Sequence, residues 1–127
     1  MKQMREALAL GALFLSMGLA PALADPVSPE IKEIYGISCK KCHGWDGTAD
    51  TGEGKKWNIE SFTSADFQKK TSDADILKAI LEGKVDADNP KKKMKAFKDL
   101  ITEAEAKELV KVVRAYAKAP GPFPGEK

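Results

Sequence analysis

The chain has 127 residues, of which 43% are hydrophobic and 31% charged. This composition is typical of one soluble globular domain and excludes a disordered or fibrous chain. Lys and Arg number 21 against 19 Asp and Glu, so the formal net charge of +2 excludes the strongly basic field of a nucleic-acid-binding protein. Both cysteines and the single histidine lie within residues 39–43, and chemistry that needs these residue types is therefore centred there.

Residues 1–24 have the pattern of a cleaved signal peptide for export. Two basic residues come first, an apolar stretch covers residues 7–20, and Ala22 and Ala24 form the small-x-small pattern that signal peptidase recognises. The alternative is an uncleaved membrane anchor, but Pro21 interrupts the apolar stretch, which falls short of the ~20 residues that a spanning helix needs. We therefore expect cleavage after Ala24, export to the periplasm and no membrane insertion of the mature protein.

The first part of the remaining chain predicts one long helix and a long loop. Ser28 and Pro29 are typical of a helix start, and apolar residues at helical spacing extend this helix over residues 29–42. Residues 44–58 contain four glycines and little periodicity, which predicts a loop. Residues 64–67 have a capping pattern that predicts one short helical turn.

The middle of the chain predicts a second helix and a second loop. This helix is expected to start after Ser72 and to end at Gly83. Residues 86–100 have no strand pattern and contain Pro90, so we expect a loop or a few turns that present Met94. Convincing β-alternation is absent from the sequence, and the predicted fold class is therefore all-α.

The C-terminal part predicts one more helix and a tail. Thr102 and Glu105 form a capping box for a helix that runs to about residue 118. Three prolines within residues 119–127 predict an extended, mobile tail. We therefore expect one domain over residues 25–118, between the signal peptide and this tail.

The segment at residues 39–43, Cys-Lys-Lys-Cys-His, is the C-x-x-C-H attachment signature of haem c. On one helical turn, thiols at positions i and i+3 can form thioethers with the two vinyl groups of one haem, while an imidazole at i+4 is aimed at its iron. We therefore expect Cys39 and Cys42 to bind one haem c covalently and His43 to be the proximal iron ligand.

Three alternative interpretations of this motif are less favoured. A structural zinc site needs four ligands from Cys and His, and the chain contains three. A thioredoxin-like redox pair would lie next to a βαβ pattern, which is absent from the sequence. A plain disulfide between Cys39 and Cys42 is compatible with export but leaves His43 unexplained.

Met94 is the strongest candidate for the second axial ligand. After removal of the signal peptide it is the only methionine, and because the chain has no second histidine, the lysines are its competitors. It lies 51 residues after His43 and between Lys93 and Lys95, where a solitary methionine is a poor core residue. We therefore expect Met94 to be the distal iron ligand, and the alternative is a surface residue in a lysine-rich loop.

With these features the sequence resembles the class I c-type cytochromes, specifically the small single-haem bacterial ones. The shared features are C-K-K-C-H-G at residues 39–44, Met94 followed by Ala96 and Phe97, L-x-T-x-x-E at residues 100–105, and V-V-R-A-Y at residues 112–116. The resemblance spans residues 28–118 and implies several helices wrapped around one haem, with the first and last helices crossing. It also implies that Tyr35 and Tyr116 pack at this crossing and that Trp57 contacts a haem propionate.

The sequence departs from this family at two places. Many relatives have Pro directly after the ligand methionine, where this chain has Lys95, so the methionine loop lacks the rigidity of that Pro. The family commonly uses a carbonyl in a Gly-Pro segment to accept the ring N–H of the proximal histidine, yet no Pro lies between Pro29 and Pro90. Another carbonyl is therefore expected to orient His43.

The expected function is that of a soluble, monomeric one-electron carrier that shuttles electrons between redox partners. A His/Met iron keeps the same ligands in both oxidation states and has no open site for substrate, and the sequence contains no catalytic constellation, so we expect no enzyme activity. Two alternatives are open. One is a peroxidase-like enzyme or gas-binding sensor with an open or labile sixth site, and the other is a haem-bearing subunit of a larger redox complex.

Lysines near Met94 predict the docking of an acidic redox partner, because a cluster of one charge steers an oppositely charged surface toward it. These lysines are Lys91, Lys92, Lys93, Lys95 and Lys98.

Overall fold

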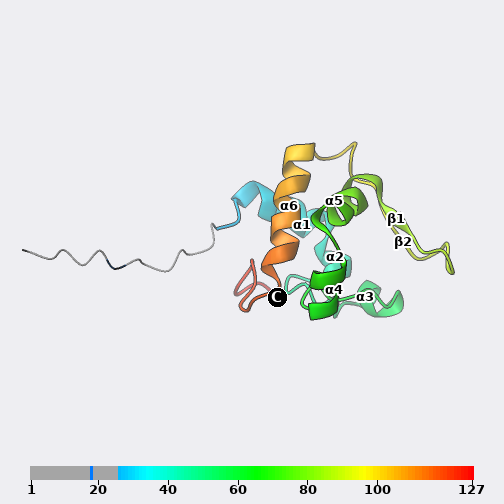
Figure 1. Ribbon diagram of the computed structural model, residues 1–127, viewed down its shortest axis with the longest axis horizontal. Coiled ribbons are helices and arrows are strands. Elements are labelled where there is room, and N and C mark those ends of the chain that lie inside the picture. Colours follow the sequence, from blue (N-terminus) through cyan, green and yellow to red (C-terminus); the bar gives the residue numbers. More distant parts are fainter. Residues whose placement is uncertain (1–17, 19–25) are drawn as a thin grey trace, which may run out of the picture.

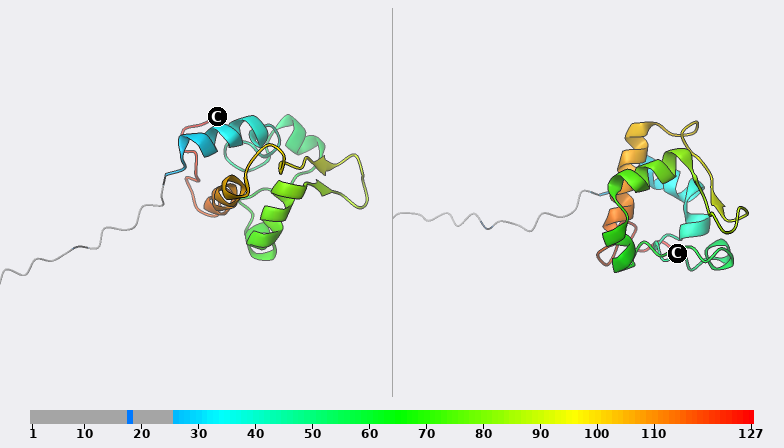
Figure 2. Two further views of the ribbon diagram at one scale, coloured as in Figure 1. Left: turned by 90° about the horizontal axis from the view of Figure 1, so that it is seen from above. Right: turned by 45° about the vertical axis from the view of Figure 1, so that its right-hand side comes forward.

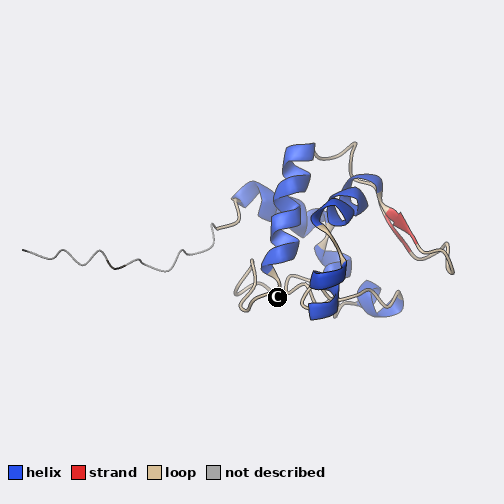
Figure 3. Cartoon of the chain, viewed as in Figure 1, coloured by secondary structure: helices blue, strands red, loops and turns tan. Residues whose placement is uncertain are grey.

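The structure, a computed structural model, describes residues 18 and 26–127 (Figure 1). The elements in chain order are α1 (Pro29–Ser38), α2 (Lys40–His43), α3 (Gly52–Lys56), α4 (Ala65–Lys70), α5 (Asp73–Glu82), β1 (Lys84–Val85), β2 (Lys93–Met94) and α6 (Glu103–Ala115). The described residues therefore form a helical domain with one small hairpin (Figure 3). Apart from Gly18, the signal peptide predicted over residues 1–24 lies outside the described residues. None of the described helices is long and apolar enough to cross a membrane.

The main helices begin where local capping predicts. The Ser28 hydroxyl accepts a backbone hydrogen bond of 3.3 Å at the start of α1. Ser72 and Asp75 form a capping box at the start of α5, and Thr102 and Glu105 form the predicted one at α6. These side chains bond N–H groups that the first turn of a helix leaves unpaired, so the predicted helix starts are confirmed.

Three elements differ from the sequence-based expectation. The helix predicted over residues 29–42 is interrupted at Cys39, whose φ of −120° separates α1 from α2. Helix α3 lies within residues 44–58, where we expected only a loop. The strands β1 and β2 pair antiparallel, with Lys84 opposite Met94, where no strand was expected. A strand of two residues and a helix of five are too short to produce a readable hydrophobic period.

Helix α6 packs against both α1 and α5 and carries much of the core (Figures 1 and 2). Ala106, on its buried face, is 0% exposed. At the crossing with α1, the rings of Tyr35 and Tyr116 lie 6.1 Å apart between centroids, as the family resemblance implies. The buried core consists of Ile31, Tyr35, Ile76, Ile80, Ala106, Leu109, Val110, Val112, Val113, Tyr116 and Phe123.

The expectation of an extended, mobile tail is wrong for Phe123. This ring is 7% exposed and lies 4.9 Å from the Tyr35 ring and 5.2 Å from the Trp45 ring, measured between centroids. A side chain near the end of the tail, Glu126, also pairs with Lys32 of α1. The tail therefore folds back onto the α1–α6 crossing, where burial of the Phe123 ring stabilises it.

Candidate cofactor site

The two cysteines and the histidine lie on a single helical turn. The backbone N–H groups of Cys42 and His43 both donate to the Cys39 carbonyl, at 3.2 and 2.9 Å. Both thiols are free and half-buried. Burial raises the pKa of Cys39 to about 12, and burial followed by the nearby Glu53 carboxylate raises the pKa of Cys42. The thiols are therefore uncharged, unlike the low-pKa thiolates of redox C-x-x-C pairs.

The imidazole of His43 is largely enclosed by the protein. Burial lowers its pKa from 6.5 to about 4, so the ring is neutral at physiological pH, which is the form that binds a metal. Its Nδ1 atom is buried and has no hydrogen-bond partner among the described residues. No described residue therefore supplies the carbonyl that we expected to orient the ring. Instead, the ring stacks on Phe62, with centroids 4.4 Å apart and planes 16° apart.

Residues of the glycine-rich segment fold back onto the end of α2. Ala49 N–H donates to the His43 carbonyl at 2.9 Å, and the Thr51 hydroxyl donates to the Cys42 carbonyl at 3.0 Å. At Gly54, a Cβ atom would lie only 2.0 Å from the Ala49 carbonyl oxygen, so this position requires glycine. These contacts satisfy carbonyls that the end of the helix leaves free, and they fix the turn that carries His43.

Met94 lies on β2, is half-buried and packs against the core. Gly83 has a φ of +76°, and a Cβ atom there would lie 2.6 Å from the Met94 carbonyl oxygen, so only glycine allows the two strands this approach. After Met94, Phe97 N–H donates to the Ile80 carbonyl at 3.0 Å and Lys98 N–H to a carbonyl of the same helix at 3.1 Å. Bonds to the end of α5 thus hold the segment in which relatives often have Pro.

The hairpin turn is held by its own polar groups. Asp86 Oδ1 accepts hydrogen bonds from the backbone N–H groups of Asp88 and Asn89, at 2.9 and 3.0 Å, and these bonds lower its pKa. The Lys92 ammonium group donates to the carbonyl of Asn58, just after α3, at 3.4 Å. In Figures 1 and 2 the hairpin and α3 lie on the same side of the domain, away from α6. The Met94 hairpin is thereby connected both to α5 and to the segment that covers α2.

The remaining predicted site residues are Trp57 and the five lysines near Met94. The indole N–H of Trp57 donates to a Glu53 carboxylate oxygen at 3.0 Å, and the Lys56 ammonium group lies 4.8 Å from the ring centroid. A propionate would compete with Glu53 for this N–H, so the contact predicted for Trp57 stays a prediction. Of the five lysines predicted to dock a partner, Lys92 is half-buried beside Asp86, 3.8 Å away, and the other four are exposed.

These donors fit a covalently bound haem. Two uncharged thiols and a neutral imidazole occupy one turn, and a thioether lies on a separately fastened hairpin. A neutral imidazole on the same turn as the two thiols is the form that binds a metal, which is consistent with such a role. Phe62 has no motif or spacing that predicts its contact with His43, and only the folded structure identifies it.

Comparisons with known proteins show the class to which this chain belongs. The family described as "Cytochrome C oxidase, cbb3-type, subunit III" matches residues 28–111. A solved structure described as "KustC0563 c-type cytochrome" is 37% identical, has a TM-score of 0.55 and covers 68% of this chain and 95% of that chain. A point mutant of the same protein, also 37% identical, has a TM-score of 0.57 and covers 68% and 96%. No curated protein matches the chain.

The chain therefore belongs to this family of c-type cytochromes, as a small class I member that binds haem c covalently and carries electrons.

Proposed function

We propose that this protein is a periplasmic one-electron carrier in which Cys39 and Cys42 attach the haem and His43 and Met94 are its two axial ligands. The observation that carries the proposal is the fastening of Met94: a hairpin bonded to the end of α5 presents the thioether separately from the C-x-x-C-H turn. When bound, the haem supplies reversible one-electron chemistry at iron. A Met/His ligand set is the one that raises the potential of such carriers.

The surroundings of both ligands favour small changes on electron transfer. His43 is half-buried and neutral, and the loop that folds over α2 hydrogen-bonds the backbone of the same turn. Phe97 and Lys98, three and four residues after Met94, are bonded to α5. Side chains held in this way move little when the charge on the iron changes, which is what a carrier requires and an enzyme with an exchangeable site does not.

The exposed lysines of the hairpin segment support the docking of an acidic partner surface. Lys91, Lys93, Lys95 and Lys98 are exposed, and they lie on either side of Met94 in the sequence. Charges on a solvated surface attract a partner over about a Debye length, ~10 Å at 0.1 M salt, and contribute little to the lifetime of the complex. We infer short-lived encounters of a monomeric carrier.

A second candidate function is suggested by the name of the matched family, which describes a subunit of an oxidase. In that case the protein would work as the haem-bearing part of a larger redox complex. Size-exclusion chromatography of the isolated mature protein separates the two: a single monomeric species supports the carrier, and aggregation or tight retention of one partner supports the subunit.

The axial ligation is tested by replacing Met94 with Ala in a host that attaches haem c. The oxidised wild-type protein is expected to be low-spin and to show the weak far-red sulfur-to-iron charge-transfer band, and M94A is expected to lose the band, open the iron and lower the potential. The matched control is Lys95→Ala, which alters the next residue of the same loop and should retain the band. A high-spin wild-type protein would instead favour the open-site alternative.

A further inference from the structure

Among the described residues, His43 finds no partner for the hydrogen bond that usually orients a metal-binding histidine. Such a ring almost always donates its second N–H to a carbonyl, a carboxylate or a water. Here Nδ1 is buried, and it is the only buried side-chain polar atom without a partner among residues 18 and 26–127. The plane of this imidazole must therefore be set by what packs against it.

The ring that packs against His43 is Phe62. Their centroids are 4.4 Å apart, the shortest separation of any aromatic pair in the described part of the chain. Phe62 also contacts Phe67 at 5.3 Å and Tyr116 at 5.8 Å between centroids. Because rings on several sides confine Phe62, it cannot turn without disturbing the cluster, and the stacked imidazole is confined with it.

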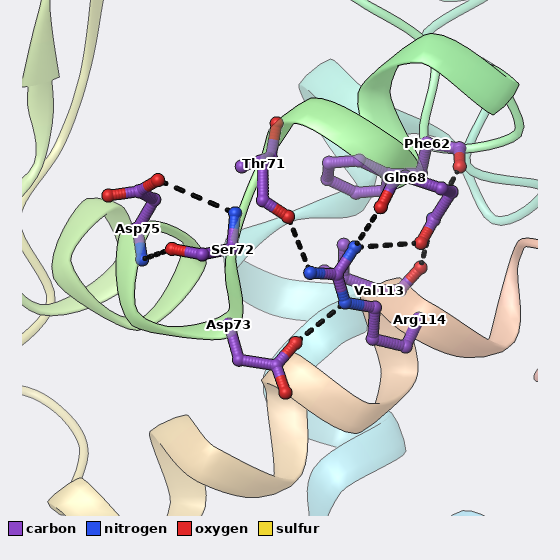
Figure 4. Close-up of polar contacts among 8 residues, drawn as sticks. All are labelled: Phe62, Gln68, Thr71, Ser72, Asp73, Asp75, Val113 and Arg114. Atoms are coloured by element: carbon purple, nitrogen blue, oxygen red, sulfur yellow. Dashed lines mark hydrogen bonds and ion pairs between the residues drawn. The ribbon is translucent and has the colours of Figure 1, made fainter.

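The backbone of Phe62 is held at both of its polar groups. Its N–H donates to the Gly47 carbonyl at 2.8 Å, and its carbonyl accepts a hydrogen bond of 2.7 Å from the Gln68 side-chain amide (Figure 4). The same Nε2 atom of Gln68 donates to the Val113 carbonyl of α6 at 3.0 Å. One amide group thus connects the segment that carries Phe62 to the last helix.

Arg114 determines which way this amide points. Its guanidinium donates to Gln68 Oε1 and to the Gln68 backbone carbonyl, both at 3.0 Å, and Figure 4 shows further bonds to the Thr71 carbonyl and to Asp73. A guanidinium has donors and no acceptor, so Oε1 must face it and Nε2 must face the two carbonyls. The exposed Asp73 adds little energy by itself but aligns the guanidinium.

We propose that Gln68 and Arg114 are positioning residues that hold Phe62 against His43 and thereby fix the plane of the imidazole, in place of a hydrogen bond to Nδ1. The proposal rests on the proposed role of His43 as an axial ligand. The orientation of an axial imidazole determines which iron orbitals it overlaps, and the hydrogen-bonded residues around a ligand are known to tune a metal centre. The positioning therefore has a spectroscopic signature that a purely structural contact lacks.

The test compares Phe62→Leu with Phe67→Leu in the oxidised, haem-loaded full protein. Both substitutions remove one half-buried ring of the same cluster, but only Phe62 contacts His43. The readout is the set of paramagnetically shifted haem methyl signals in the proton NMR spectrum, together with the EPR g-values. We expect F62L to shift and reorder these signals, and F67L, which can act on His43 only through Phe62, to shift them much less. Equal shifts in both variants, or none in F62L, would overturn the proposal.

A second variant tests the positioning residue without touching the aromatic cluster. Gln68→Glu keeps the length of the side chain and the acceptor for Arg114 but removes the donor to the Phe62 carbonyl. We expect a smaller shift of the same methyl signals, in the same direction as in F62L. Q68E keeps the proposal falsifiable if F62L does not fold, because a wild-type spectrum of Q68E rejects it.

Loss of the ligand itself separates this proposal from the proposed function. If His43→Ala retained the wild-type axial spectrum, His43 would not be the ligand and the proposed function would fail. If that spectrum were lost in H43A but unchanged in F62L and Q68E, only the positioning role of Phe62 and Gln68 would be wrong.

Discussion

His43 lies against a buried aromatic cluster at the C-terminal end of α6, whereas Met94 lies on a two-residue strand among exposed lysines. Side-chain packing between distant segments holds the first, and backbone hydrogen bonds to the end of α5 hold the second. Regions with few buried contacts and solvent-accessible hydrogen bonds open at lower cost than a packed core. We therefore expect heating to disrupt the Met94 hairpin before the packed region around His43. That region is expected to unfold only when its aromatic core is damaged or when His43 is protonated.

Disrupting the aromatic cluster near His43 is expected to have the largest effect on the free energy of unfolding. Tyr116 is 4% exposed and its ring contacts Phe62, Tyr35 and Phe123. We expect Tyr116→Ala to lower the free energy of unfolding by about 3–5 kcal/mol, because the cavity it leaves adds to the lost burial. Tyr116→Phe keeps the ring and removes the hydroxyl that donates to the Trp45 carbonyl, at a cost of about 1 kcal/mol. Thermal denaturation followed by circular dichroism measures both, and equal losses would show that the ring packing is unimportant.

Substitution of Gly83 is expected to be the most selective way to disrupt the hairpin that carries Met94. Its φ of +76° and ψ of −178° lie in a region that only glycine occupies readily, so Gly83→Ala should cost about 1–3 kcal/mol and loosen the hairpin. We expect the far-red band of the oxidised protein to disappear at a lower temperature than in the wild type. The matched control is Gly52→Ala, where a Cβ atom would meet nothing within 4 Å. Wild-type behaviour of the band in G83A would mean that the hairpin does not position Met94.

Acid is expected to affect the region around His43 and not Met94, which is the reverse of the order expected on heating. Burial lowers the pKa of His43 from 6.5 to about 4, so an unfolded chain takes up a proton between these pH values that the folded chain does not. The contribution of neutral His43 to the free energy of unfolding is therefore complete above pH 6.5 and decreases as the pH falls toward 4. Iron binding favours the same neutral form of the imidazole. A thioether has no proton to gain in this range. We expect a spectrophotometric titration of the haem-loaded protein to show no transition near pH 6.5, and a transition there would contradict the lowered pKa of His43.

The smallest expected effect concerns the lysines beside Met94. Lys95→Glu should slow electron transfer to an acidic redox partner a few-fold at low ionic strength, because one attractive charge becomes repulsive. Lys69→Glu, an exposed position on α4, is the control of equal charge change and should have the smaller effect. Stopped-flow rates measured at increasing salt should converge for all three proteins. Rates that do not depend on salt would remove the docking role of the lysine cluster.

The sequence alone predicted the features that depend on neighbours within one helical turn. The helix starts after Ser28, Ser72 and Thr102 follow from side chains that bond N–H groups three residues ahead. The spacing of the C-x-x-C-H motif likewise brings two thiols and an imidazole to one turn without any long-range contact. Such patterns can be recognised because every participant lies close by in the sequence.

Only the tertiary structure decided how the two proposed ligands are held. The stacking of Phe62 on His43 depends on Gln68 and Arg114, which lie 46 residues apart, and the hairpin of Met94 depends on strands too short to show a pattern. Phe123 likewise docks because the α1–α6 crossing offers an aromatic surface, which the tail by itself does not indicate. The physical reason is the same in each case: packing energy arises where distant segments meet, and a local sequence pattern does not specify which segments these are.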